Sequence, residues 1–257
     1  MYYLARTQML SDYGYPESLQ LISRLGFDGA EISVLDKEFE VRSDFFKGNV
    51  IEKIKNEIAI MEIASISCHL DYVNSDENFN TIVKTFSVAR ELKIDIVIIN
   101  GAVSKAENKD EKEKEWQKMI SRTSKLCQEA QKYNVRLAKE FEPGFIACST
   151  EDLLKVFSEV NSPNLFANID LGHVFLCDSE PFKALDKLQG KVIHGHIENM
   201  KKDVHDHLLP YEGDMDLQQY INKLRAIGFD GPLALDLYGY DYEKVSEKSL
   251  AYLRDKS

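Results

Sequence analysis

Two hydrophobic patterns alternate along the chain, and together they predict a regular succession of strands and helices. Short, almost wholly apolar runs such as residues 94–99 are typical of strands that are buried on both faces. The longer stretches between them carry apolar residues three or four positions apart, as at Ile51, Ile54 and Ile58, which predicts amphipathic helices. The predicted strands are residues 1–5, 30–33, 64–68, 94–99, 135–141, 165–169, 192–197 and 233–237. The predicted helices are residues 16–25, 49–61, 78–92, 109–133, 151–160, 180–188, 217–227 and 242–253.

Residues that commonly begin or end helices support several of these boundaries. Pro16 stands in the first turn of the first predicted helix, and Gly26 follows its end. Asp76 and Thr150 are the expected N-caps of the helices that follow them. Residues 198–215 show neither the strand pattern nor the helix pattern, so we expect a long loop there. Its place suits a substrate lid or specificity element.

Eight strand–helix units within 257 residues predict an α/β protein with a (β/α)8 barrel, the TIM barrel. The sequence Gly-Phe-Asp-Gly occurs at 26–29 and again at 228–231, each time between a predicted helix and the next strand, as expected for repeated units. No linker or low-complexity tract interrupts the chain, so we expect a single domain over residues 1–257. The alternative is an open doubly wound sheet, which usually carries a Gly-x-Gly-x-x-Gly loop that this sequence lacks.

Composition narrows the expected partners and compartment. The chain is 44% hydrophobic, enough for a sizeable core, and its net charge of -11 gives little attraction for nucleic acid or anionic membranes. No stretch approaches the roughly 20 apolar residues that cross a membrane. The four cysteines stand far apart and residues 1–6 lack the features of a signal peptide, so we expect a cytoplasmic protein. The oligomeric state, including a homo-oligomer, stays open.

Polar residues stand at the C-terminal ends of seven of the eight predicted strands, where the chemistry of a barrel of this type lies. One acid or histidine at the end of an apolar strand is ordinary. Several charged groups converging on one buried mouth would repel each other unless a positive charge lies among them. The residues are Glu31, His69, Asn100, Glu140, Asp170 with His173, His196 and Asp236.

Four of these residues, on strands five to eight, form the predicted metal site: Glu140, Asp170, His196 and Asp236. Three carboxylates and one imidazole suit Mn²⁺, Mg²⁺, Co²⁺ or Zn²⁺. Asp170 has an alternative role as the cap of the turn or helix that follows it. Glu140 has an alternative as one of an exposed pair with Glu142, and we prefer Glu140 because Glu142 stands nearer Pro143, where the chain leaves the strand.

The other histidines divide by their position. On the seventh strand we expect His196 to face the barrel centre and His194 to face the helices as a structural residue. His205 and His207 lie in the polar loop, where such a pair is either exposed on the surface without a role or part of the site.

Four segments resemble the xylose isomerase-like TIM barrels. This superfamily includes sugar phosphate isomerases and epimerases, ketose 3-epimerases, inosose dehydratase and isomerase, and endonuclease IV. The resemblance covers essentially the whole chain and is specific for the superfamily rather than for one activity. The segments are 137–144 (LAKEFEPG), 168–173 (NIDLGH), 194–199 (HGHIEN) and 231–236 (GPLALD).

The epimerase branch of this superfamily implies roles for the predicted metal ligands. By resemblance, Glu140 binds metal and moves a proton, while Asp170 and His196 also bind metal. The last ligand of that branch is normally Glu, and here it is Asp236, which is one methylene shorter. Either the metal shifts toward the eighth strand or Asp236 acts through a water molecule.

The same resemblance suggests which residues contact a substrate. His173 matches a substrate-contacting histidine, and Lys202 stands where the epimerase branch usually has a substrate-binding arginine. Endonuclease IV uses this barrel with more metals, but Asn100 replaces a histidine of that enzyme and His205 replaces an aspartate, so the nuclease is the less favoured interpretation. The residues expected to contact substrate are His173, Lys202, His69, Asn100, Glu31, His205 and His207.

These patterns favour a divalent-metal-dependent isomerase or epimerase that acts on a sugar or sugar phosphate. It would abstract a proton next to a carbonyl and pass through an enediolate. Glu140 would remove the proton and Asp236 would return one on the other face, or the reverse. A non-catalytic sugar-binding barrel is a further hypothesis. The main alternative is a metal-dependent hydrolase or lyase, endonuclease IV-like or inosose dehydratase-like, with further metal bound by His69, His173, His205 and His207.

Overall fold

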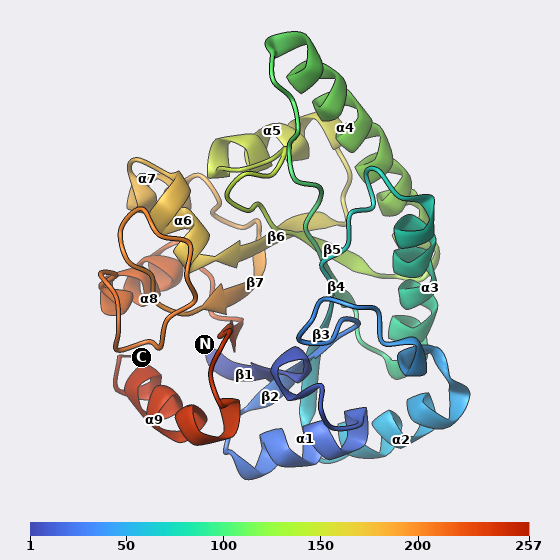
Figure 1. Cartoon of the computed structure of the whole chain (residues 1–257), viewed down its shortest axis with the longest axis vertical. Helices are drawn as coiled ribbons and strands as arrows, with labels where there is room; N and C mark the ends of the chain where they lie inside the picture. The colour runs from blue at the N-terminus through green and yellow to red at the C-terminus, as the bar shows by residue number, and fades with distance from the viewer. Residues whose placement is uncertain (257) are drawn as a thin grey trace.

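A computed structural model describes residues 1–256 of the chain, and its central feature is a closed barrel of parallel strands. Strands follow one another around the barrel in chain order, and the first strand pairs with the last to close it (Figure 1). The predicted TIM barrel is therefore confirmed. The strands are β1 (Tyr2–Arg6), β2 (Gly29–Ser33), β3 (Glu62–Cys68), β4 (Ile96–Ile99), β5 (Arg136–Lys139), β6 (Leu165–Asp170), β7 (Val192–Ile197) and β8 (Pro232–Leu235).

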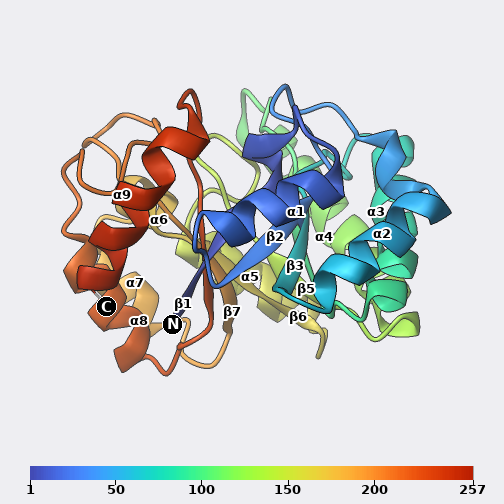
Figure 2. The same ribbon diagram turned by 90° about the horizontal axis from the view of Figure 1, so that it is seen from below.

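Helices form the outer layer around this barrel, as Figures 1 and 2 show from two directions. None of the helices within residues 1–256 combines the length and the apolar character needed to cross a membrane. Short 3₁₀ helices cover Thr7–Leu10 and Ser43–Phe46. The α-helices are α1 (Tyr15–Arg24), α2 (Gly48–Ile58), α3 (Asp76–Leu92), α4 (Lys109–Lys132), α5 (Thr150–Val160), α6 (Leu171–Cys177), α7 (Pro181–Asp186), α8 (Leu217–Ala226) and α9 (Tyr242–Asp255).

Three details of the predicted helices were wrong. The segment between β6 and β7 holds two short helices, α6 and α7, where one helix was predicted at 180–188. The N-cap of α3 is Ser75 rather than Asp76, and that of α5 is Ser149 rather than Thr150. In both cases the serine hydroxyl accepts a hydrogen bond from the backbone N–H three residues later, which leaves the neighbouring residue inside the first turn.

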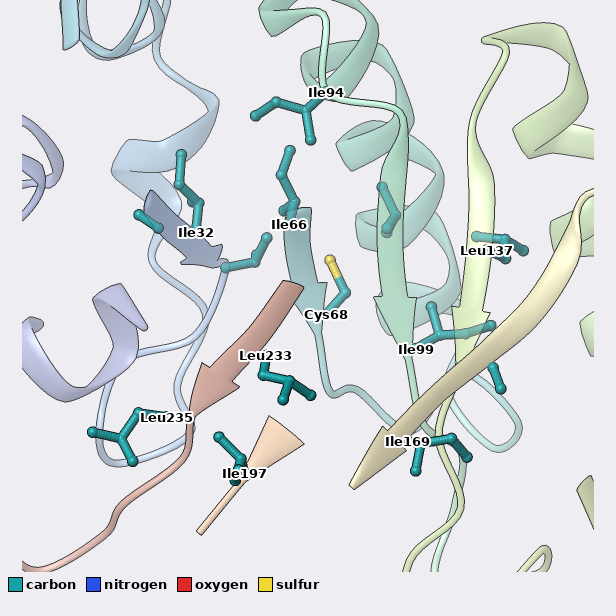
Figure 3. Close-up of a cluster of buried hydrophobic side chains, with 14 of the residues drawn as sticks. Ile32, Ile66, Cys68, Ile94, Ile99, Leu137, Ile169, Ile197, Leu233 and Leu235 are labelled. Carbon is teal, nitrogen blue, oxygen red and sulfur yellow. The ribbon is translucent and has the colours of Figure 1, made fainter. Parts of the chain in front are cut away.

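The main hydrophobic core lies between the barrel and the helices. Alternate residues of each strand point outward into this layer, including Ile32, Ile99 and Leu235 (Figure 3). Fully burying such a side chain stabilises the fold by about 1.5–3 kcal/mol. The intervening positions of β4 and β5, Ile96, Ile98 and Ala138, form a separate small cluster inside the barrel. Above this apolar floor, toward the C-terminal ends of the strands, the inward-facing residues are polar.

The two Gly-Phe-Asp-Gly turns flank β1 on both sides. Gly26 and Gly228 adopt φ values of 82° and 83°, a left-handed conformation that suits glycine. Asp28, in the first turn, accepts a hydrogen bond from the backbone N–H of Tyr3 at 2.8 Å, and Asp230, in the second, pairs with the N-terminal ammonium group. The repeated sequence thus builds the same turn before β2 and before β8, the two neighbours of β1.

Candidate active site

A hollow of about 430 Å³ lies at the C-terminal ends of the strands, and most of the predicted site residues reach it. Glu31, Asp170 and His196 lie beneath it, fully or almost fully buried inside the barrel. The remaining wall includes Phe39, Phe145 and Tyr238. The predicted residues that line it are His69, Asn100, Glu140, His173, His205, His207 and Asp236.

Three of the four predicted metal ligands, all carboxylates, converge on one nitrogen atom of the fourth, His196. The Nδ1 atom of this histidine lies 3.3 Å from Glu140 Oε2, 4.0 Å from Asp170 Oδ2 and 3.8 Å from Asp236 Oδ2. All four side chains are buried. The structure thus brings together three carboxylates and one imidazole from four neighbouring positions around the barrel, a donor set that suits a hard or borderline divalent ion.

Asp170 caps the helix that follows it and also directs one oxygen toward the other predicted ligands. Its Oδ1 atom accepts a hydrogen bond from the backbone N–H of His173 at 2.8 Å, which caps α6. Its Oδ2 atom is buried and has no hydrogen-bond partner among the described residues. A buried carboxylate oxygen without a partner is costly, and a bound cation would remove that cost. This atom is therefore the structural observation that supports a metal at the predicted site.

Glu140 stands where β5 ends, and its backbone N–H still donates to Ile99 O at 2.8 Å. Its Oε2 atom accepts a hydrogen bond from Asn168 Nδ2 and lies 3.3 Å from His69 Nε2. Burial by itself would raise the pKa of Glu140, but His196 and His69 hold it well below its usual range. Glu142 instead accepts a hydrogen bond from Asn100 Nδ2 at 2.7 Å, on the wall of the hollow.

His194 was predicted to face the helices, and this was wrong. Its Nε2 atom lies 3.0 Å from Ser65 Oγ of β3, on the far side of the barrel, and 3.5 Å from Glu31 Oε2. His196 Nε2 lies 3.0 Å from the same oxygen of Glu31. Residues two apart on a strand share a face, so both histidines point inward.

The pKa values of the two histidines are shifted in opposite directions. Burial lowers the pKa of His194 to about 3, so its ring is neutral. Burial opposes protonation of His196 as well, but Glu31 and Glu140 raise its pKa well above the usual value. The charge of His196 therefore depends on the acids around it, and a metal ion would take the place of its proton, because the metal binds a neutral imidazole.

Arg6 is a site residue that the sequence analysis missed. Its side chain is fully buried at the end of β1, where Nε donates to Glu31 Oε1 at 2.8 Å and Nη1 pairs with Asp236 Oδ1. The guanidinium also reaches Gln8 Oε1 at 3.0 Å and Tyr238 Oη at 3.1 Å. It supplies part of the positive charge that the converging acids require.

Asn168 and Glu198 were also missed, although the alternation of the strands points to both. Asn168 precedes Asp170 by two residues and bridges Glu140 to His194, accepting from the ring at 2.8 Å. Glu198 follows His196 by two residues and is fully buried. Counting in steps of two from Asp170 and His196 would have found them.

Three histidines form the upper part of the site. His173 Nε2 lies 3.1 Å from His205 Nε2, and the ring of His207 packs edge-on against those of His173 and Tyr238. His205 and His207 therefore line the hollow, where His205 is exposed and His207 is half-buried. Phe39 stacks on Tyr238 with ring centroids 5.6 Å apart and closes this side of the hollow.

The structure does not bring Lys202 to this cluster. Its side chain is exposed, and its backbone N–H donates to Asp214 Oδ2 at 2.9 Å. It lines a different hollow, next to Phe175 and Cys177 of α6. Lys202 is therefore not part of this cluster.

Fold and site together define a barrel with a buried carboxylate–histidine centre beneath a solvent-accessible hollow. The chain matches the family described as xylose isomerase-like TIM barrel over residues 19–256, and it belongs to that family.

Curated relatives are distant and act on different substrates. The chain is 26% identical to the fructoselysine 3-epimerase of Escherichia coli O157:H7 over 48% of its own length, and the match covers only 46% of that relative. It is 24% identical to the inosose isomerase of Bacillus subtilis strain 168 over 89% of this chain and 85% of that protein. These relatives support the resemblance to isomerases and epimerases without specifying a substrate.

Solved structures share the fold at low sequence identity. A probable 3-DHS dehydratase from Bacillus anthracis superimposes with a TM-score of 0.84 at 18% identity, covering 100% of both chains. The IOLI protein with a bound zinc atom gives a TM-score of 0.82 at 18% identity, covering 100% of this chain and 96% of that one. The same fold therefore occurs in a protein described as a dehydratase and in one that binds zinc.

Proposed function

We propose that this protein is a divalent-metal-dependent isomerase or epimerase of a sugar or sugar phosphate. The observation that carries the proposal is the convergence of Glu140, Asp170 and Asp236 on His196 Nδ1, beneath a hollow large enough for a small carbohydrate. The unpartnered Asp170 Oδ2 atom adds independent support for a cation there. The curated isomerase and epimerase relatives point to the same class of reaction.

Glu140, Asp170 and His196 would hold the metal, with Asp236 as the fourth residue. When bound, a divalent ion at this place would polarise the oxygens of a ketose and stabilise the negative charge that develops in the reaction. Asp236 keeps one oxygen, Oδ2, directed toward His196, while Arg6 occupies Oδ1. Arg6 thereby fixes the orientation of the Asp236 carboxylate.

Glu140 is the proposed base. Its lowered pKa keeps it as a carboxylate at neutral pH, able to accept a proton from the carbon next to the substrate carbonyl. Asp236, whose pKa is also lowered despite its burial, is the proposed second acid–base group. In an epimerase it would return the proton on the opposite face of that carbon, or the two acids would exchange these roles.

The residues above the acids are the proposed substrate contacts. Asp170 and Glu140 raise the pKa of His173 although its burial opposes this, so its ring can carry a positive charge and donate to a hydroxyl or phosphate oxygen. Phe39 and Tyr238 offer a stacked aromatic wall for the apolar face of a sugar ring. The remaining proposed contacts are Glu31, His69, Asn100, His205 and His207.

A second candidate function is a metal-dependent hydrolase or lyase. It is favoured by His173, His205 and His207, which each offer one ligand atom within 4.8 Å of the others. Replacing both His205 and His207 by Ala would abolish a reaction that depends on metal at this cluster. Full retention of activity in that double variant would exclude this candidate.

The test of the main proposal is a panel of ketoses and ketose phosphates assayed with Mn²⁺, Co²⁺, Mg²⁺ or Zn²⁺, followed by Glu140→Gln on whichever substrate turns over. Loss of a general base typically lowers kcat by about 10²–10⁴-fold, and we expect this variant to fall in that range. Glu142→Gln removes the neighbouring carboxylate on the same loop and is the matched control, with a decrease of at most about tenfold. Full turnover by Glu140→Gln would contradict the mechanism.

A further inference from the structure

The hollow at the mouth of the barrel offers no lysine or arginine among its described lining residues. Lys202, which was expected to contact a substrate, lines a different hollow. Lys139 donates to the backbone carbonyl of Asn100 and to Tyr72 Oη, and it does not line this hollow either. A phosphate group carries a charge of about −1.5 to −2 at neutral pH and is usually bound by such cationic side chains. The wall of the hollow therefore does not suit a phosphate.

The charges beneath the hollow do not supply the missing cation. A divalent ion at the proposed metal site and the guanidinium of Arg6 would carry three positive charges, against four carboxylates. His173 can add one positive charge, because Asp170 and Glu140 raise its pKa, and this only balances the set. The buried centre thus has no surplus positive charge with which to hold a phosphate. The four carboxylates are those of Glu31, Glu140, Asp170 and Asp236.

Two further carboxylates line the hollow outside this buried centre. Glu142 is half-buried and comes from the segment after β5, whereas Asp206 is exposed and comes from the loop between β7 and α8. Within residues 1–256, neither of them forms an ion pair with another side chain. The hollow therefore carries negative charge that the proposed metal ion would not balance.

Asn100 gives an independent indication of what this wall binds. Its side chain lines the hollow although the residue is only 5% exposed, and its Nδ2 atom donates to Glu142 Oε1 at 2.7 Å. An ionised carboxylate only accepts hydrogen bonds, so this contact fixes the orientation of the amide and leaves Oδ1 as an acceptor. That oxygen is buried and has no hydrogen-bond partner in the described part of the chain. A donor group bound against this wall would satisfy it.

We propose that the substrate is a ketose that carries a protonated amine, and that Asn100 and Glu142 bind this amine. The inference rests on the proposed function, because it takes the hollow to hold a ketose. An ammonium group has three donors and no acceptor, so it complements the free amide oxygen and the neighbouring carboxylate, while Asp206 adds negative charge to the same hollow. A hydroxyl group would leave that charge unbalanced. A phosphate would place further acceptors and negative charge beside Glu142.

The experiment measures binding rather than turnover. Protein supplied with Mg²⁺ is titrated at pH 7 with D-fructose, 1-amino-1-deoxy-D-fructose and D-fructose 1-phosphate, which differ only in the group at C1. The ring C–H resonances of the histidines report Kd by NMR, because four of the six histidines line the hollow. We expect the amine to bind at least about tenfold more tightly than D-fructose, as is typical of a hydrogen bond to a charged group. The phosphate should bind more weakly than D-fructose.

Variants of the two carboxylates test their part in this preference. Glu142→Gln should reduce the preference for the amine over D-fructose by about tenfold and change the Kd of D-fructose by less than about twofold. Asp206→Asn, at an exposed acid, should reduce it by about threefold. Asp203→Asn is the matched control, because Asp203 is an exposed acid of the same loop that lines a different hollow. For an amine substrate the loss in Glu142→Gln should appear in KM rather than in kcat, so this variant still serves as the control for the proposed base.

Three results would overturn the proposal: no binding of the amine, binding of the phosphate as tight as that of the amine, or a full preference for the amine in Glu142→Gln. The proposed function fails separately. If the amine binds most tightly and no ketose turns over, the substrate charge is supported and the isomerase is contradicted. If a ketose turns over and its phosphate binds most tightly, the isomerase is supported and the amine is contradicted.

Discussion

Glu31 and Asp236 are buried acids on opposite sides of β1, and one arginine neutralises both. Glu31 comes from β2 and Asp236 follows β8, so the guanidinium of Arg6 connects the three strands at the seam of the barrel. A buried charge left without its partner costs far more than an exposed one. Arg6 therefore contributes to stability and also orients an acid of the proposed reaction.

We predict that Arg6→Met lowers the free energy of unfolding by about 3–5 kcal/mol, because it leaves two buried carboxylates without their partner. Urea denaturation followed by circular dichroism measures this change. Arg254→Met is the matched control, since Arg254 pairs with Asp28 at 2.7 Å with both side chains well exposed. An exposed pair of this kind contributes at most about 1 kcal/mol. Equal losses in the two variants would contradict the role assigned to Arg6.

At the scale of single residues, the sequence predicted the acids and histidines of the site but not all of their partners. The four proposed metal-binding residues could be found because each is a polar residue at the end of an apolar strand. Arg6 was overlooked because the predicted first strand stopped at Ala5, one residue too early. Glu198 was assigned to a loop and does follow β7, but its spacing from His194 and His196 continues the inward-facing positions of that strand.

Lys139 connects β5 to the segment that follows β4. Its side chain is almost fully buried, and its ammonium group donates to the backbone carbonyl of Asn100 and to Tyr72 Oη at 3.3 Å. Burial lowers the pKa of this lysine from 10.5 to about 8. The contact holds the end of β4, and with it the Asn100 side chain, beside the hollow.

We predict a pH-dependent stability difference between the wild-type protein and Lys139→Met. Between about pH 8 and about pH 10.5 the unfolded chain keeps the Lys139 proton and the folded protein does not, so this group makes stability rise with pH. The wild-type protein should therefore gain up to about 3 kcal/mol relative to Lys139→Met across that interval. Urea denaturation at pH 7.5 and pH 10.5 measures it. Lys132→Met, at an exposed lysine, is the control. If the difference in stability between the wild-type protein and Lys139→Met were the same at both pH values, the prediction would be contradicted.

Among the elements, strands and long helices were predictable and short helices were not. A long amphipathic helix such as α4 carries several apolar positions on one face, which makes its period visible. The seven residues of α6 are buried along their first turn and begin directly at the end of β6, so no polar face or preceding loop marks them. The position of His173 in the site depends on this helix, because Asp170 caps it.

At the scale of the whole molecule, bound metal should stabilise the barrel. Glu140, Asp170 and His196 come from three neighbouring strands, and an ion among them binds only the folded chain. At a free metal concentration of 100 times Kd, binding raises the free energy of unfolding by about 2.7 kcal/mol. For a protein of this size we expect the Tm to fall by about 5–10 °C when the metal is removed with a chelator. Differential scanning calorimetry measures the change.

The same measurement on Glu140→Gln is the control for this linkage. Since that variant lacks a proposed ligand, its Tm should respond less to metal than that of the wild-type protein. An equal rise in both proteins would show that the stabilising ion binds elsewhere. If the Tm of the wild-type protein did not change over the whole metal titration, that result would contradict a metal at this site.

The barrel as a whole was the most predictable feature. Eight alternating units and two copies of one turn define it, because each unit repeats the same local pattern and short connections leave few ways to arrange them. The charge pattern inside the barrel was less predictable. It depends on side chains that meet across the barrel, as Ser65 and His194 do, and such pairs are 129 residues apart in the chain.

The closure between β1 and β8 has a consequence for how the protein is made. Arg6 and Asp236 are 230 residues apart, so a ribosome must synthesise nearly the whole chain before the two can meet. Until residues 232–235 emerge, β1 has one open edge, to which another nascent chain can pair. Synthesis that stops before Asp236 would therefore give a polypeptide with most of its strands and an incomplete candidate site.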